Sequence, residues 1–105
     1  MKISPTLKQK KRYVRFEIMG EEQLNASEVE RTVFSALLQF VGELGMSRMQ
    51  PMFVKEKFSF PYFVLKVAHT YVDECRAGII LIKKIKNKPV IIKSIITSGT
   101  LKKLA

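Results

Sequence analysis

The chain has 105 residues, a length that suits one domain with a single hydrophobic core and is short for two. Apolar residues make up 47% of it, a fraction too high for an intrinsically disordered chain. Its net charge of +10 favours an anionic partner, with nucleic acid ahead of an anionic membrane surface.

The same composition narrows the cellular compartment. The single cysteine rules out an internal disulfide framework, and no segment approaches the ~18 apolar residues of a membrane span. The first residues also lack the apolar core of a signal peptide. We therefore expect a soluble, cytoplasmic protein with no membrane among its partners.

Positive charge gathers at the two ends of the sequence. No acid precedes Glu17 and none follows Glu74, whereas five acids lie between positions 17 and 30. One basic run alone is most simply a solvated surface, but two acid-free ends can hold one polyanion if the fold brings them together. The basic residues of these ends are Lys2, Lys8, Lys10, Lys11, Arg12 and Arg15, and then Lys83, Lys84, Lys86, Lys88, Lys93, Lys102 and Lys103.

The first segment, residues 1–11, is polar and basic and predicts an extended arm. We place an α+β domain at residues 12–97 and a basic tail at residues 98–105. Residues 12–19 alternate between apolar and polar side chains, which predicts a half-buried strand that opens this domain.

An amphipathic helix is expected next. Ser27 and Glu30 have the spacing of a capping box, in which a hydroxyl and a carboxylate satisfy each other's backbone donors. Apolar residues then recur from Val29 onward at spacings of three and four. Gly42 or Gly45 is expected to end the helix.

The second half of the chain predicts two strands, a helix and a last strand. Proline opens each of the two strands, at residues 52–58 and 62–68. A second capping box beginning at Thr70 precedes a helical apolar face over residues 72–86, which ends in lysines that the helix dipole favours. Residues 90–96 form an apolar run that predicts the last strand.

This order of elements is typical of a ferredoxin-like or RRM-like α+β fold, βαββαβ, in which an antiparallel four-stranded sheet carries both helices on one face. The first and third strands lie side by side at the centre of such a sheet. The other face is left open. Alternation assigns to this open face Tyr13, Arg15, Glu17, Phe53, Lys55, Lys57, Tyr62, Val64, Lys66, Ile91, Lys93 and Ile95.

Catalytic chemistry finds little support in the sequence. His69 and Cys75 are the only histidine and cysteine, so the usual zinc spacings cannot be built. His69 stands just before a helix, which favours a local structural role, and Cys75 lies on an apolar helix face. Asp73 and Glu74 are adjacent, so on a helix they diverge by roughly 100° rather than converge. We expect no catalytic residue and no metal or cofactor bound by this chain.

Two interpretations of the open face stay open. Tyr13, Phe53 and Tyr62 could stack unpaired bases beside the basic residues, as four-stranded sheets of this architecture do. The glycine-aromatic pattern of an RNA-recognition motif is missing, however. The alternative is that a protein partner covers the face, because exposed apolar patches mark contacts. The residues that favour this alternative are Val64, Ile91 and Ile95.

Four stretches, in order along the chain, resemble one family. They are residues 5–14 with the run Pro-Thr-Leu-Lys and then Lys-Lys-Arg-Tyr-Val, residues 40–45, residues 71–82, and residues 90–103 with Val-Ile-Ile-Lys and then Ser-Gly-Thr-Leu-Lys-Lys. The chain resembles archaeal ribonuclease P protein component 2 across nearly its whole length.

The resemblance implies a role in tRNA processing. It implies a protein subunit of the ribonucleoprotein that removes 5′ leaders from precursor tRNA, with catalytic Mg²⁺ on the RNA subunit. The implied partners are ribonuclease P RNA in its complex with precursor tRNA, protein component 3, and further ribonuclease P proteins. The alternative function, drawn from the fold alone, is a ligand-binding regulatory module paired with an enzyme. A stand-alone nuclease is opposed by the lack of a convergent His or acid cluster.

The resemblance also gives the Ser-Gly-Thr stretch a function. We expect a turn in which Gly99 takes a positive φ, while Ser98 and Thr100 help to present hydrogen-bond donors to an RNA phosphate. An ordinary turn with solvated lysines is the alternative. The predicted RNA-binding residues are Lys8, Lys10, Lys11, Arg12, Arg15, Lys93, Ser98, Gly99, Thr100, Lys102 and Lys103. The predicted protein-partner residues are Val64, Ile91 and Ile95.

Overall fold

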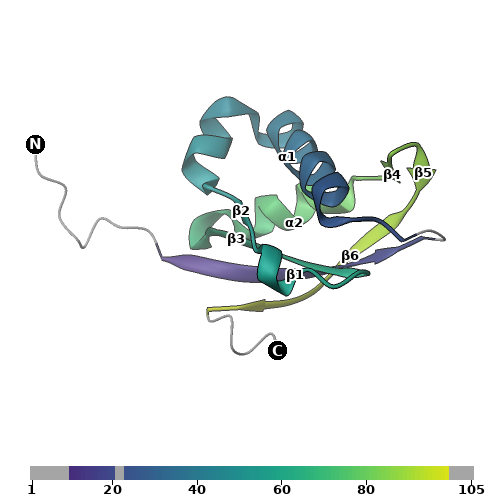
Figure 1. Ribbon diagram of the computed structural model, residues 1–105. Coiled ribbons are helices and arrows are strands. Elements are labelled where there is room, and N and C mark those ends of the chain that lie inside the picture. Colours follow the sequence, from purple (N-terminus) through teal and green to yellow (C-terminus); the bar gives the residue numbers. More distant parts are fainter. Residues whose placement is uncertain (1–9, 21–22, 100–105) are drawn as a thin grey trace, which may run out of the picture.

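The computed structural model describes residues 10–20 and 23–99 (Figure 1). Four antiparallel strands form a sheet in the order β2-β3-β1-β6, and two helices cover one of its faces. The predicted fold class is therefore confirmed, including the central position of β1 and β3. The elements are β1 (Lys11–Met19), α1 (Ala26–Met49), β2 (Met52–Phe53), β3 (Tyr62–Ala68), α2 (Val72–Ile80) and β6 (Ile91–Ser98).

Helix α1 begins at a different cap from the predicted one. The Asn25 side chain accepts a hydrogen bond from the Glu28 amide at 2.9 Å, and Glu28 Oε1 accepts one from the Asn25 amide at 3.1 Å. The capping box therefore lies two residues before the expected pair, Ser27 and Glu30. At the other end, Gly42 kinks the helix, with φ 75° and ψ 176°, but the chain resumes its helical path to Met49.

The short edge strand β2 corrects the prediction of a strand over residues 52–58. It ends at Phe53, and the 3-10 helix η2 (Lys55–Lys57) follows. Phe53 consequently lies in the core, 6% exposed, rather than on the open face. Val54 takes the open side instead, and its amide donates to the Val64 carbonyl at 3.0 Å.

The second helix is shorter than predicted. A 3-10 turn, η3 (His69–Tyr71), leads into α2 without a side-chain cap, so the expected capping box at Thr70 is absent. The helix ends at Ile80, and the lysine-rich stretch forms a hairpin of β4 (Lys84–Ile85) and β5 (Lys88–Pro89). The two loop residues between these strands have positive φ, as two-residue hairpin turns require.

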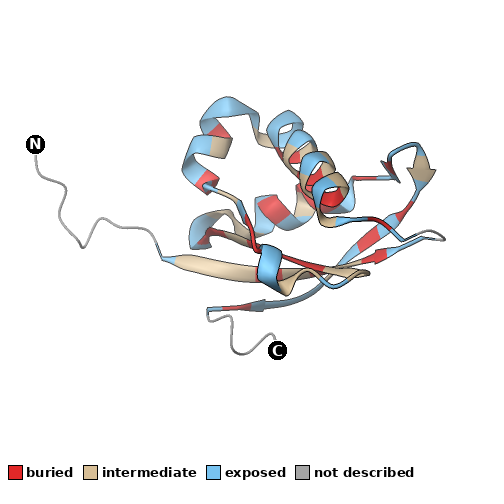
Figure 2. Ribbon diagram, viewed as in Figure 1, coloured by how far each residue is buried: buried red, intermediate tan, exposed pale blue. Residues whose placement is uncertain are grey.

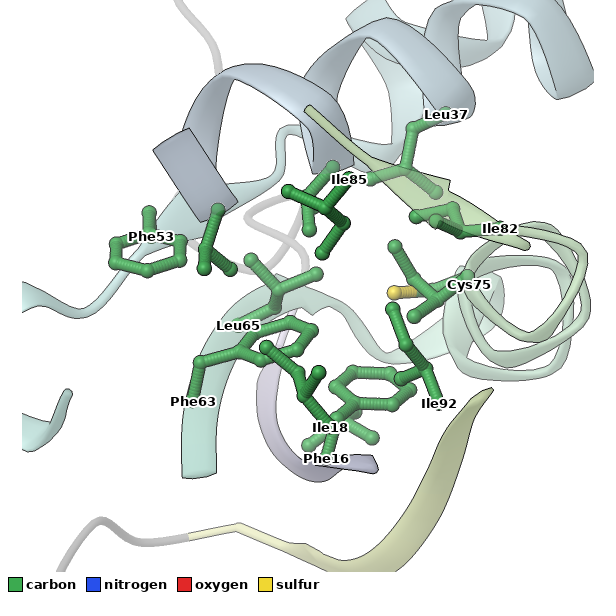
Figure 3. Close-up of a cluster of buried hydrophobic side chains, with 14 of the residues drawn as sticks. Phe16, Ile18, Leu37, Phe53, Phe63, Leu65, Cys75, Ile82, Ile85 and Ile92 are labelled. Carbon is green, nitrogen blue, oxygen red and sulfur yellow. The ribbon is translucent and has the colours of Figure 1, made fainter. Parts of the chain in front are cut away.

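The core lies between the sheet and the helices, where Figure 2 shows buried residues on both layers. Phe16 stacks on Phe63 at 5.1 Å between ring centroids, and Phe63 stacks on Phe53 at 6.0 Å. In Figure 3 these sheet residues face Leu37 and Cys75 on the helical side. Alternation along β1 and β3 sends one set of side chains into this core, so the other set is left on the open face.

Strand β6 carries a bulge that shifts its register. Arg15 stands opposite Ile96, whereas Phe16 stands opposite Ser94, so Ile95 is the extra residue. Ile96 therefore joins the open face opposite Arg15, a position that simple alternation along the strand had not assigned to it. The bulge therefore lies beside Arg15 of β1.

Candidate nucleic-acid interface

Three adjacent strands each place a positively charged side chain on the open face. Lys66 on β3, Arg15 on β1 and Lys93 on β6 all belong to the face opposite the helices, as the register of the three strands requires. Lys66 was predicted on this face but not among the RNA-binding residues. It joins the cationic face because it pairs with Tyr13 across the strands, and the Tyr13 ring centroid lies 5.8 Å from Lys66 Nζ.

The strands nearest the two basic ends of the chain, β1 and β6, pair with each other up to one end of the sheet. Tyr13 pairs with Ser98 across β1 and β6, which brings Arg12 next to Gly99. A Cβ atom on Gly99 would lie 3.8 Å from Arg12 Nη1, an ordinary contact distance. Lys10, which is exposed, immediately precedes β1 at this end. Arg15 and Lys93, one from each acid-free segment, line the same hollow, whereas Lys84, Lys86 and Lys88 belong to the β4–β5 hairpin, where Lys86 pairs with Glu28.

Lys11 is less available to bind a phosphate than the neighbouring cations are. Its ammonium donates a hydrogen bond to Gln50 Oε1. Burial, and in second place the charge of Lys66, lowers the pKa of Lys11. Both effects show that Lys11 lies in a partly desolvated, cation-rich position. A nearby phosphate would relieve the repulsion between Lys11 and Lys66.

The Ser-Gly-Thr stretch differs from the predicted turn. Ser98 is still part of β6 and only 8% exposed, so its side chain offers little surface to a phosphate. Among the described glycines, Gly42 has a positive φ and Gly99 does not, so the predicted left-handed turn at Gly99 is wrong. Gly99 lies beside the Arg12 guanidinium, with room for a Cβ atom at an ordinary contact distance.

Several predicted RNA-binding residues fall outside the described part of the chain. The basic arm contributes Lys8, and the tail contributes Thr100, Lys102 and Lys103. Their role in RNA binding stays a prediction. Of the described residues, Arg15 and Lys93, with Lys66 added, lie on the open face, whereas Lys10 and Arg12 lie at one end of the sheet, where Arg12 pairs with the buried Val67.

A hollow of about 500 Å³ lies within the open face. The guanidinium carbon of Arg15 lies 4.5 Å from the centroid of the Tyr62 ring, a cation–π contact. Glu17 pairs with Tyr62 on one side and with Lys93 on the other. The hollow is lined by Arg15, Glu17, Tyr62, Lys93, Ser94 and Ile95.

The predicted protein-partner residues divide into two groups. Ile91 is 64% exposed and Ile95 46%, so both offer apolar surface. Val64 is only 2% exposed because Val54 and Tyr13 pack over it, so the expectation of an exposed Val64 is wrong. The short edge strand and the turn that follows it explain this difference.

The potentially reactive residues Cys75 and His69 are placed in structural rather than catalytic roles. Burial raises the pKa of Cys75 to about 12, which keeps the thiol protonated near neutral pH. The His69 amide donates to the Lys10 carbonyl at 2.8 Å, which ties the start of β1 to the end of β3.

Within residues 10–20 and 23–99, no three His, Cys, Asp or Glu side chains lie close enough to hold a metal ion. None of the described helices is long and apolar enough to cross a membrane.

The fold and the surface together define a small ferredoxin-like α+β protein with a cationic sheet face. The sequence profile of the Rpp14/Pop5 family matches residues 12–105, so the chain belongs to this family. Ribonuclease P protein component 2 of Methanocaldococcus jannaschii is 39% identical over 101 residues, which cover 96% of this chain and 74% of the relative. The protein of the same name from Thermococcus kodakarensis is 31% identical over 102 residues, covering 97% and 85%.

A structural comparison agrees with this assignment at the level of the fold. A chain in the cryo-EM structure of yeast ribonuclease MRP matches with a TM-score of 0.71 over 89% of this chain and 76% of that chain. Sequence identity in this match is 14%, so it shows the fold alone. The resemblance noted in the sequence to archaeal ribonuclease P protein component 2 is confirmed by the family and by the relatives.

Proposed function

We propose that the chain is a non-catalytic protein subunit of ribonuclease P, which binds and stabilises the catalytic RNA that removes 5′ leaders from precursor tRNA. The observation that carries this proposal is the cationic open face, where Lys66, Arg15 and Lys93 lie on three adjacent strands, with Arg12 beside Gly99 at the end of the sheet. Membership of the Rpp14/Pop5 family and archaeal relatives named ribonuclease P protein component 2 support it.

The mechanism follows from electrostatics. Close packing of a folded RNA brings phosphates together, and cationic side chains offset their repulsion. Lys10 and Arg12 at the end of the sheet, with Lys66 and Lys93 across its face, present such charges on a rigid scaffold. The catalytic Mg²⁺ belongs to the RNA in this proposal, and the complex acts in the cytoplasm.

The test is cleavage of precursor tRNA across a magnesium titration, with the RNA subunit alone, the protein alone, and both together. We expect the protein to lower the magnesium concentration needed for cleavage and to cleave nothing by itself. Cleavage by the repurified protein without RNA would overturn the proposal.

The proposal extends to a protein partner, component 3, on the apolar part of the open face. Ile91 stands opposite Met19, and both side chains are exposed, at 64% and 40%. Ile91→Glu should weaken binding of component 3 strongly, because a charge would be buried without a partner. Leu44, also 64% exposed but on α1, provides a matched control, Leu44→Glu. If only the Leu44 variant releases the partner, the helices form the interface instead.

A further inference from the structure

We propose that the hollow on the open face binds one unpaired guanine nucleotide of RNA, with Glu17 as the residue that selects the base. This inference rests on the proposed function, since it names a nucleotide-specific contact within the same RNA-binding face. Its basis is the placement of an acid, an aromatic ring and two cations around one hollow.

The Arg15–Tyr62 pair provides a stacking platform. The guanidinium carbon lies 4.5 Å from the ring centroid, so a planar cation and an aromatic ring already lie against each other. Unpaired RNA bases stack on both kinds of group. Tyr62 is only partly buried, and Arg15 likewise, so the pair is reachable from solvent. The exposed side chain of Ile95, at the bulge, adds an apolar wall to the same hollow.

Glu17 is the feature that phosphate binding alone does not explain. A carboxylate amid cations weakens the attraction for phosphate, and within the described residues Glu17 makes no ion pair or hydrogen bond. Its cross-strand partners are Tyr62 and Lys93, whose side chains belong to the same face. The carboxylate therefore stands between the stacking platform and an exposed ammonium, where a base edge would lie.

The chemistry of a carboxylate selects guanine. An ionised carboxylate only accepts hydrogen bonds, and its two oxygens can accept from two neighbouring donors at once. Guanine presents two adjacent donors, N1–H and the exocyclic amine, on its Watson–Crick edge. The corresponding edges of adenine, cytosine and uracil each present one donor group. Lys93 is positioned to hold the phosphate of the bound nucleotide.

The hollow suits a nucleotide better than a protein segment. Three of its six lining residues are charged, namely Arg15, Glu17 and Lys93. Its volume of about 500 Å³ lies in the range of small-molecule sites. A protein in this position would bury all three charges, each of which would then need a partner.

The experiment measures binding of the full chain to hexauridine and to the same oligonucleotide with one guanosine, by fluorescence anisotropy at constant salt. We expect the guanosine oligonucleotide to bind about tenfold more tightly, the range for a bidentate contact to a base. Inosine in place of guanosine, which lacks the exocyclic amine, should lose most of this gain. Glu17→Gln should abolish the preference for guanosine without weakening hexauridine binding, whereas Glu74→Gln on α2 should change neither.

Four results would overturn the proposal. They are equal affinity for the two oligonucleotides, a preference that Glu17→Gln leaves intact, displacement of the bound oligonucleotide by component 3, and binding of guanosine monophosphate as tight as that of the oligonucleotide. The last result would assign the hollow to a free nucleotide. If ribonuclease P RNA still binds in any of these cases, the proposed function stands. If the chain binds neither the oligonucleotides nor that RNA, both proposals fail.

Discussion

Removing charge from the end of the sheet should change how RNA binding depends on salt. The described cations that the sequence predicts to contact RNA number five, namely Lys10, Lys11, Arg12, Arg15 and Lys93. Each neutralised phosphate contributes about −0.7 to −0.9 to the slope of log affinity against log salt, so five contacts give about −3.5 to −4.5. Lys10→Ala combined with Arg12→Ala removes two of them. The slope should then become shallower by about 1.4 to 1.8.

The assay is equilibrium binding to ribonuclease P RNA between 50 and 500 mM salt, with circular dichroism as the folding control. A matched double variant, Arg31→Ala with Arg76→Ala, removes two exposed arginines from the helices, which cover the other face of the sheet. This control should leave the slope nearly unchanged. An unchanged slope in the Lys10 and Arg12 variant, or an equal change in the control, would refute the placement of RNA at this end of the sheet.

Three further predictions concern the scaffold. Phe63→Ala, at the centre of the aromatic stack, should lower the free energy of unfolding by about 3–5 kcal/mol in a urea titration, whereas Phe63→Leu should lower it much less. Gly42→Ala should lower it by about 1–3 kcal/mol, because its φ of 75° and ψ of 176° suit glycine almost alone, while no atom lies within 4 Å of the added Cβ. Hydrogen bonds from Lys86 and from the Asn25 amide lower the pKa of Glu28 below its ordinary value of 4.5. Glu28→Gln keeps the cap but loses the charge, so its melting temperature should fall below the parent's at neutral pH. The difference in melting temperature should vanish as the pH falls through the folded-state pKa of Glu28, which lies below 4.5. A difference that persists at lower pH would mean that the charge of Glu28 is not its cause.

Alternation predicted the central strands because each buries one face. Strands β1 and β3 are flanked on both sides, so their period of two is strict. The edge strands were predicted less well. Turn η2 ends β2 after Phe53, and the bulge at Ile95 shifts β6, and neither feature changes the apolar pattern of the sequence. The assignment of Phe53 to the open face therefore failed, and Val64, which does lie on that face as assigned, is covered by Val54 and Tyr13.

Helix ends were also poorly predicted, for a related reason. Two overlapping capping boxes are possible near the start of α1, and the structure uses Asn25 rather than Ser27. The lysine-rich segment after α2 continues the helical apolar spacing with Ile82 and Ile85, yet both side chains reach the core from a loop and a hairpin. Spacing alone does not separate a further helical turn from such a hairpin.

The basic ends were recognisable from charge alone, but the binding geometry was not. Lys66 belongs to the cationic face because the register of β1 and β3 pairs it with Tyr13. The stacking of Arg15 on Tyr62 depends on a diagonal contact between strands far apart in sequence. Such contacts follow from register, which single-sequence patterns fix only approximately.

The central claim is that this chain is a ribonuclease P subunit, and recovery of its RNA from cells tests it most directly. The full chain would be captured from native lysate at moderate salt, and the bound RNA sequenced beside that of the Lys10 and Arg12 double variant. We expect ribonuclease P RNA to be the most enriched species with the parent chain and to be depleted with the variant. Recovery of no RNA, or of RNAs in proportion to their abundance in the lysate, would contradict the claim.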